Sequence, residues 1–228
     1  MQKYLISLLI ASVTSLAPAG VIASGSLSSS DGQIDGTGIW VDKNILSAKE
    51  QPKWTPAVLN WSVSQNDDKS WRYQYDFSGY RAGVSHIIFQ TSSNFTCDDL
   101  MNPEGPYADY EIGLFTEKQG NPNLPDNIYG VKFDLKSSTS IAISFDSFRS
   151  PMWGDFYAKS GKINGVQVAA WNAEFGEEAT PWKQGSPNEF GRILVPDTTV
   201  PEPATAVILL AGMAGIAQLA RKRKIVGR

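Results

Sequence analysis

Cysteine and histidine are nearly absent from this chain of 228 residues, which contains one of each. One Cys cannot form an internal disulfide, and one His excludes metal sites that need two imidazoles. Charged residues make up 19% of the chain, below the usual quarter, whereas aromatic residues reach 11%. The composition excludes a disulfide scaffold and a disordered polyelectrolyte, and it suits one globular domain with short accessory segments.

A surplus of positive charge is also missing from the middle of the chain. Residues 24–199 hold 14 basic and 22 acidic residues, a net charge of −8. This balance disfavours a nucleic-acid partner. The acidic loops Asp67-Asp68 and Cys97-Asp98-Asp99 could hold calcium, but no EF-hand spacing is present, and solvated charges that aid solubility are the simpler interpretation. No other cofactor or metal is predicted.

Long apolar runs are confined to the two ends. At the start, Lys3 precedes an almost unbroken apolar run from Leu5 to Val13, and small or apolar residues precede Ser24. This order is typical of a secretory signal peptide, here residues 1–23. Ala17-Pro18-Ala19 offers a second cleavage point. We therefore expect an exported protein with an N-terminal signal helix.

The C-terminal end combines three different segments. Pro201-Glu202-Pro203 is followed by an uncharged run of 17 residues, 204–220, and then by Arg221-Lys222-Arg223-Lys224. The run is at the short limit for a single transmembrane helix. Four adjacent cations resist translocation, so they stay cytoplasmic and the preceding domain faces outward. The two prolines keep Glu202 in an extended, accessible segment.

This tail, residues 200–228, resembles the PEP-CTERM sorting signal of exported Gram-negative bacterial proteins. The resemblance implies that Pro201, Glu202 and Pro203 are recognised by an exosortase, a membrane-embedded processing enzyme. It further implies that residues 204–220 are a temporary membrane anchor, with the basic tail 221–228 as its stop. The precursor would sit in the inner membrane with its domain in the periplasm, and the product would reach the cell surface or an extracellular matrix of exopolysaccharide or biofilm.

The middle of the chain predicts an all-β domain over residues 38–199, built as a two-sheet β-sandwich or jelly roll. Short apolar or alternating runs are separated by Gly, Pro, Asn and Asp, and no window sustains a helical period. Residues 24–37, rich in Ser, Gly and Asp, are expected to be a flexible lead-in, although 32–40 could add an edge strand. The expected strands are 38–42, 58–64, 71–77, 84–91, 110–116, 129–135, 140–148, 155–159, 166–172 and 192–195.

Two groups of aromatic residues could bind a glycan, because flat rings pack on the C–H faces of sugars. The alternating stripe in residues 71–77 fits a core-facing strand better. A second group combines rings with polar side chains, but a turn leading into a buried strand is its favoured interpretation. Its blocks resemble uncharacterised PEP-CTERM proteins, a resemblance that implies no activity. The candidate glycan contacts are Trp153, Asp155, Tyr157, Trp171 and Asn172.

Catalytic signals are weak. His86 alternates with apolar neighbours, which favours a structural histidine with its hydrogen bonds satisfied, and the adjacent Ser85 would point to the opposite face. Cys97 lies in no protease motif. Asp109 and Glu111 share a strand face, roughly 6 to 7 Å apart, within the range that glycosidases use. With this many acidic residues, such a pair arises by chance.

We therefore predict a non-catalytic, exported surface or matrix protein, with glycan binding as its finer function. The alternative is a secreted polysaccharide hydrolase that uses a carboxylate pair drawn from Asp109, Glu111 and Asp155. An ice-binding surface is not favoured, because no regular Thr repeat is present.

Overall fold

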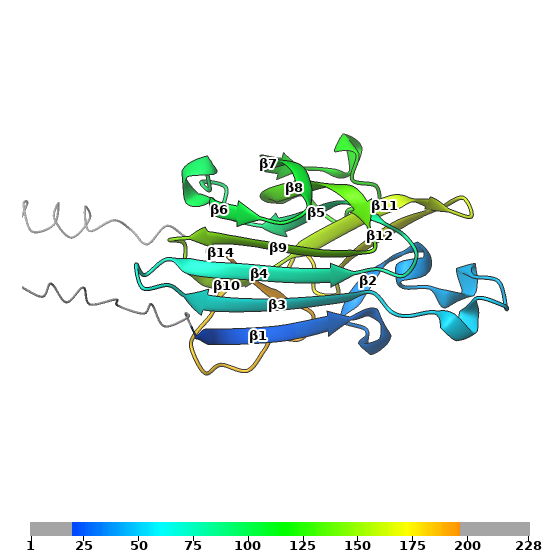
Figure 1. The fold of residues 1–228 in the computed structure, drawn as a ribbon, viewed down its shortest axis with the longest axis horizontal. Helices are drawn as coiled ribbons and strands as arrows, with labels where there is room; N and C mark the ends of the chain where they lie inside the picture. The colour runs from blue at the N-terminus through cyan, green and yellow to red at the C-terminus, as the bar shows by residue number, and fades with distance from the viewer. Residues whose placement is uncertain (1–19, 197–228) are drawn as a thin grey trace, which may run out of the picture.

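The architecture comes from a computed structural model that describes residues 20–196. Residues 1–19 of the predicted signal segment, the predicted transmembrane helix and the whole sorting motif lie outside the described part, whereas residues 20–23 are described. Strands dominate the domain, and every pairing between them is antiparallel (Figure 1). The prediction of an all-β domain with two large sheets is confirmed. No helix within residues 20–196 is long and apolar enough to cross a membrane.

The first large sheet has five strands in the order β1-β3-β4-β9-β6. Its central strands alternate buried and exposed residues, as expected for a sheet with one face on the core. The strands are β1 (Val21–Ser28), β3 (Val58–Gln65), β4 (Trp71–Ser78), β9 (Ser140–Ser147) and β6 (Met101–Glu104).

The second large sheet has six strands in the order β2-β12-β11-β5-β8-β7. Its middle strands are buried on both faces, because the loop between β7 and β8, residues 116–127, covers part of the outer face. The strands are β2 (Ile34–Thr37), β12 (Val166–Asn172), β11 (Phe156–Ile163), β5 (Val84–Gln90), β8 (Ile128–Ser138) and β7 (Tyr107–Phe115).

A small third sheet, in the order β13-β10-β14, adds the last strands of the described chain. These are β10 (Pro151–Gly154), β13 (Thr180–Pro181) and β14 (Ile193–Pro196). Short 3-10 turns complete the fold: η1 (Ser29–Asp31), η2 (Gly38–Trp40), η3 (Lys43–Ile45), η4 (Gln51–Lys53), η5 (Cys97–Asp99) and η6 (Glu117–Gln119).

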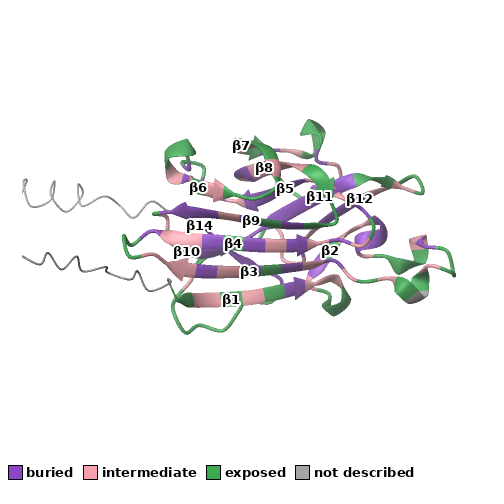
Figure 2. Cartoon of the chain, viewed as in Figure 1, coloured by how far each residue is buried: buried purple, intermediate pink, exposed green. Residues whose placement is uncertain are grey.

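The core lies between the two large sheets (Figure 2) and combines aliphatic side chains with many aromatic rings. Tyr73, Tyr75 and Phe77 of β4 are buried, so the prediction that this stripe faces the core is confirmed. The Tyr75 ring stacks on Phe89 of the opposite sheet, with ring centroids 3.9 Å apart, and its hydroxyl donates to the Leu194 carbonyl at 2.8 Å. The stripe therefore joins both large sheets and β14.

The prediction of a flexible lead-in at residues 24–37 is wrong. β1 pairs with β3 from Val21 to Ser28, and β2 pairs with β12 at the edge of the six-stranded sheet. The edge strand considered within 32–40 is therefore present. β1 could not be predicted from its Ser- and Gly-rich sequence, because few of its side chains are buried and no apolar alternation results. Its pairing depends on backbone hydrogen bonds. The β-domain thus begins by Val21 rather than at residue 38.

The expected strand at residues 38–42 is also wrong, because that segment forms η2. Gly38 has φ +78°, which turns the chain away from β2. Ile39 and Trp40 then enter the core, where Trp40 packs edge-on against Phe77 at 5.1 Å. A short apolar run can close the end of a sandwich as well as it can form a strand.

Candidate functional site

The predicted glycan cluster is not a surface. Trp153, Asp155, Tyr157 and Asn172 are buried, each at most 2% exposed, whereas Trp171 is half-buried. Trp153 packs edge-to-face on Trp61, with centroids 5.5 Å apart. Four of the five side chains therefore have no face to offer a sugar, and the favoured interpretation, a turn leading into a buried strand, describes them.

Asp155 and Asn172 instead form a buried polar hub between β10, β11 and β12. The Asp155 carboxylate accepts hydrogen bonds from Asn172 Nδ2 at 2.8 Å and from the Gly176 backbone N–H at 2.9 Å. Asn172 Oδ1 in turn accepts from the Phe156 N–H at 2.9 Å. Burial raises the pKa of Asp155, although the bonds from Gly176 and Asn172 oppose that rise. These contacts join the chain between β10 and β11 to the end of β12.

The carboxylates considered for a hydrolase lie on the edge strand β7. Asp109 and Glu111 are both exposed. Glu111 accepts from Lys132 Nζ at 2.9 Å, and Asp109 accepts from the Tyr110 N–H at 2.8 Å. Asp155, the third candidate, is buried in the hub. The three therefore do not share one accessible cleft.

His86 is buried on the outer face of the six-stranded sheet, beside the Tyr157 ring at 5.9 Å. Burial, followed by the charges of Lys159 and Lys132, lowers the pKa of His86 to about 4. A hydrogen bond with the Asn121 side chain opposes the fall in its pKa, so the prediction of a structural histidine stands. Ser85 donates instead to the Lys159 carbonyl at 3.0 Å, so Ser85 and His86 form no catalytic pair.

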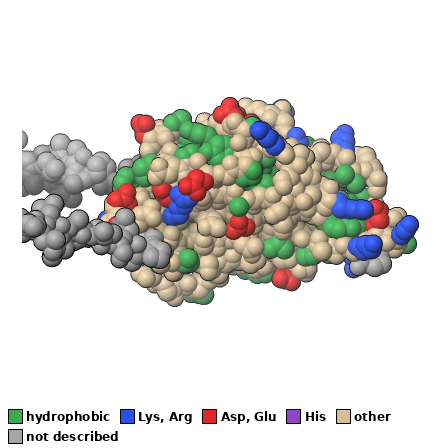
Figure 3. Space-filling model, viewed as in Figure 1, with side chains coloured by type: hydrophobic (Ala, Val, Ile, Leu, Met, Phe, Trp, Pro, Cys, Tyr) green, Lys and Arg blue, Asp and Glu red, His purple; other side chains and the backbone are tan. Residues whose placement is uncertain are grey.

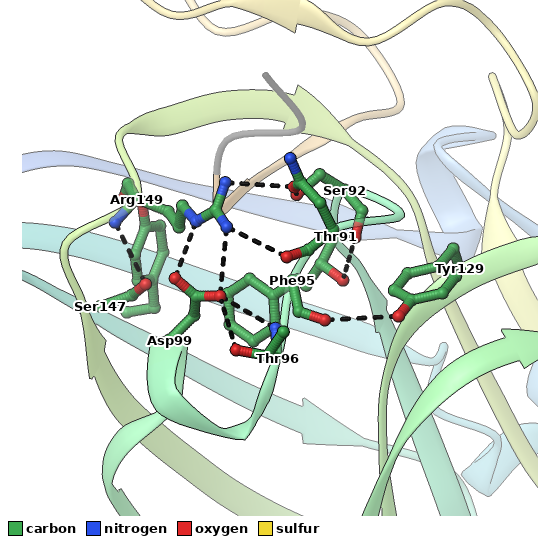
Figure 4. A network of polar contacts seen from close by, with 10 residues as sticks. Thr91, Ser92, Phe95, Thr96, Asp99, Tyr129, Ser147 and Arg149 are labelled. Atoms are coloured by element: carbon green, nitrogen blue, oxygen red, sulfur yellow. Dashed lines mark hydrogen bonds and ion pairs between the residues drawn. The ribbon is translucent and has the colours of Figure 1, made fainter. Parts of the chain in front are cut away.

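The acidic loops considered for calcium already have partners. Asp99 accepts from Arg149 Nε at 2.9 Å and Nη2 at 3.1 Å, as Figure 4 shows. Asp68 accepts from both the N–H and the hydroxyl of Ser70. Within the described ranges, no three carboxylate, thiol or imidazole groups gather around one point. Calcium binding stays a prediction. Cys97 is exposed and unpaired in this region.

Two adjoining hollows share Tyr80 and Arg81, at the turn between β4 and β5; we call them the Tyr80 groove. The first, about 420 Å³, is also lined by Ser47, Lys49, Glu50 and Lys53. The second, about 310 Å³, is lined by Thr55, Pro56, Ser78, Gly79, Thr139 and Ser140. An aromatic ring, hydroxyls and charged groups thus meet in one open depression.

The geometry of the Tyr80 groove is fixed by its backbone. Arg81 has φ +55°, and its guanidinium lies over the Tyr80 ring, 5.8 Å from the centroid. Arg81 also pairs with Glu50. Hydrogen bonds from Ser47 and Arg81 lower the pKa of Glu50. Sequence reasoning missed this groove because its residues come from three separate loops that share no periodic pattern.

A third hollow, about 200 Å³, lies between β1 and the segment before β14. Trp61 and Phe190 contribute its rings, and Asn188 closes it by donating to the Ser24 carbonyl at 3.0 Å. The Trp61 ring is 97% covered and already packs on Trp153. This hollow is smaller than either part of the Tyr80 groove.

Comparison with known proteins identifies one matching region. Residues 199–224 match the family model described as the PEP-CTERM protein-sorting motif. This range contains the Pro-Glu-Pro segment, the apolar run and the four cations singled out from the sequence, all outside the described residues. No curated protein and no solved structure matches the chain. The chain carries a PEP-CTERM tail, and the β-domain has no matched relative.

Proposed function

We propose that this protein is a non-catalytic component of the cell surface or extracellular matrix that binds polysaccharide after export. The match of residues 199–224 to the PEP-CTERM motif is the observation that carries this proposal, because that motif marks proteins sorted by exosortase-type machinery. The exported domain then works in an environment rich in secreted glycans.

The Tyr80 groove supports the binding part of the proposal. Glycan sites combine a ring that stacks on sugar C–H groups with polar side chains that bind hydroxyls. Tyr80 supplies the ring, and Ser47, Thr55 and Thr139 supply hydroxyls. The hydrolase alternative has less support, since its three carboxylates are separated between an exposed edge strand and the buried hub.

Sorting is tested by the mass and location of the protein in its host, with and without the exosortase-like enzyme. We expect the wild-type strain to lose the segment that follows the Pro201–Pro203 region. A strain without the enzyme should keep a full-length, membrane-bound form. If the tail 221–228 is retained in both strains, it is a permanent anchor and the placement in the matrix must be withdrawn.

Glycan binding is tested by retention of the full chain, in nonionic detergent, on immobilised neutral and anionic polysaccharides. Tyr80→Leu keeps apolar bulk but removes the stacking ring, so we expect it to weaken retention. Tyr110→Leu, on β7, is the matched control and should bind like the wild type. Absence of retention on every polysaccharide would remove the binding function and leave sorting intact.

A further inference from the structure

The two ends of the domain differ in charge. β1 begins and β14 finishes at the same end of the molecule (Figure 1). The distal loops, at the opposite end, are residues 29–31, 38–57, 79–83, 136–139 and 161–166. Register places them together, because Ser28, Val58, Ser78 and Ser140 lie in one row across the five-stranded sheet.

The distal loops hold six basic and three acidic residues, whereas the rest of residues 20–196 holds eight basic and eighteen acidic ones. Lys and Arg side chains gather visibly at this end (Figure 3). A domain that is acidic as a whole therefore presents a basic pole. An anion approaching it is repelled over most of the surface and attracted at this end.

Two cations in the Tyr80 groove are available to a ligand. Lys49 and Lys53 are exposed and form no ion pair with any residue of the described part. Arg81 is paired with Glu50, which also accepts from the Ser47 hydroxyl at 3.0 Å. That pair holds the guanidinium over the Tyr80 ring, so Lys49 and Lys53 contribute the uncompensated charge.

From this arrangement we propose that the Tyr80 groove binds an anionic polysaccharide, one with carboxylate groups on its sugars. This inference rests on the proposed glycan-binding function and names its substrate class. Two free lysines beside one ring suit a polymer with about one charge per sugar. A nucleic acid strand carries a phosphate about every 3.4 Å and needs a denser array of cations. The acidic remainder of the domain also opposes nucleic acid.

The location of the groove fits a protein tethered by its tail. The last described strand, β14, ends at Pro196, and the sorting motif begins within a few residues of it. While the tail is in the membrane, the basic pole is the end directed away from the tether. The domain would then hold the polysaccharide at its outer end.

The test measures binding of the full chain, in nonionic detergent, to alginate, a polyuronic acid, with dextran as a neutral glycan and duplex DNA as another polyanion. Lys49→Gln with Lys53→Gln should weaken alginate binding about tenfold and lower its dependence on salt. Lys118→Gln with Lys183→Gln makes the same charge change on exposed lysines elsewhere. A further control replaces the four cations of the tail, Arg221→Gln, Lys222→Gln, Arg223→Gln and Lys224→Gln. It measures how much the basic tail itself contributes to alginate binding.

The outcomes separate the two proposals. Alginate binding that falls only in the Lys49/Lys53 variant, without comparable binding of dextran or DNA, supports the inference. Equal losses in the Lys118/Lys183 or tail variants would overturn it, as would equal binding of DNA. Binding of dextran alone overturns the anionic class and leaves the proposed glycan function standing. If neither glycan binds, and no other polysaccharide is retained, the proposed function itself fails.

Discussion

At the scale of single residues, buried polar side chains affect how the free energy of unfolding of this domain depends on pH. His86 lies under the loop that covers the outer face of the six-stranded sheet, where its imidazole is 7% exposed and hydrogen-bonds with the Asn121 side chain. Burial removes water from the imidazole and disfavours its charged form. Protonation of His86 therefore destabilises the folded state.

We expect the free energy of unfolding to fall as the pH falls from about 6.5 to about 4. The pKa of His86 is about 4 in the folded chain, against 6.5 for an unperturbed histidine, because burial and then Lys159 and Lys132 disfavour the cation. The unfolded chain therefore binds a proton in this window that the folded chain does not. The full effect is about 3 kcal/mol.

Urea unfolding at several pH values between 4 and 8 measures the slope of the free energy of unfolding against pH. His86→Phe removes the titrating group and should flatten the slope in that window. Asp155, whose pKa is raised by burial, gives a slope of opposite sign and is present in both proteins. An unchanged slope in the variant would assign the effect to other groups.

A second prediction concerns the hub, where Asp155 has a structural role. Asp155→Ala leaves the Gly176 N–H and the Asn172 amide without an acceptor, so we expect a loss of about 3 kcal/mol in the free energy of unfolding. Asp67→Ala, at an exposed position, should change stability little. Below its melting temperature, the Asp155 variant should still bind polysaccharide; selective loss of binding would return Asp155 to a site role.

At the scale of elements, one arginine fixes the segment between β5 and β6. Arg149 donates to both carboxylate oxygens of Asp99, and also to the side chain and carbonyl of Asn94, at 3.2 Å each (Figure 4). Burial raises the pKa of Asp99, but hydrogen bonds from Arg149 and Thr96 outweigh it and leave the pKa lowered. The planar fork of an arginine is what such paired bonds require.

Arg149→Lys should therefore loosen residues 92–99 while keeping the charge. We expect amide hydrogen exchange there to accelerate about tenfold, because a single ammonium cannot replace the forked contact. Arg72→Lys makes the same change beside Glu104 and Asp146 and serves as the matched control. Equal exchange in residues 92–99 of both variants would show that the charge alone suffices.

The strand β1 bears on where the mature chain begins. Cleavage after Ala23 would remove the pairings of Val21 with Ser64 and of Ala23 with Val63, whereas cleavage after Ala19 keeps β1 whole. We therefore predict Gly20 as the first residue of the mature protein. Intact-mass measurement decides, and a chain that begins at Ser24 would show that β1 pairs only through its second half.

Strands with strong alternation were predictable. β3 and β4 match their predicted ranges to within a residue, because apolar side chains on one face need a core. β1 was missed because Ser and Gly leave no such pattern. Burial of the hub residues was the favoured interpretation, but the contact between Asp155 and Asn172 was not predicted, since Asp and Asn beside rings look the same in sequence whether they face water or each other.

At the scale of the whole molecule, the sequence revealed the route of export but not the charged groove. The tail is one contiguous segment, so its order of Pro-Glu-Pro, apolar run and cations can be recognised directly. Lys49, Lys53 and Arg81 come together only because the strands return their loops to one end. The net charge of the domain does not indicate this basic pole, because the acidic residues elsewhere outnumber its basic residues.

The position of β14 also determines how the domain bears mechanical tension. A force applied between a tethered tail and a polymer held by the distal loops runs along the long axis. β14 meets β10 at four register positions, from Ile193 to Pro196. Pulled lengthwise, these hydrogen bonds are sheared together and are not peeled apart one by one. The lifetime of the tethered domain under load then depends on the rate of unfolding, not on its equilibrium stability.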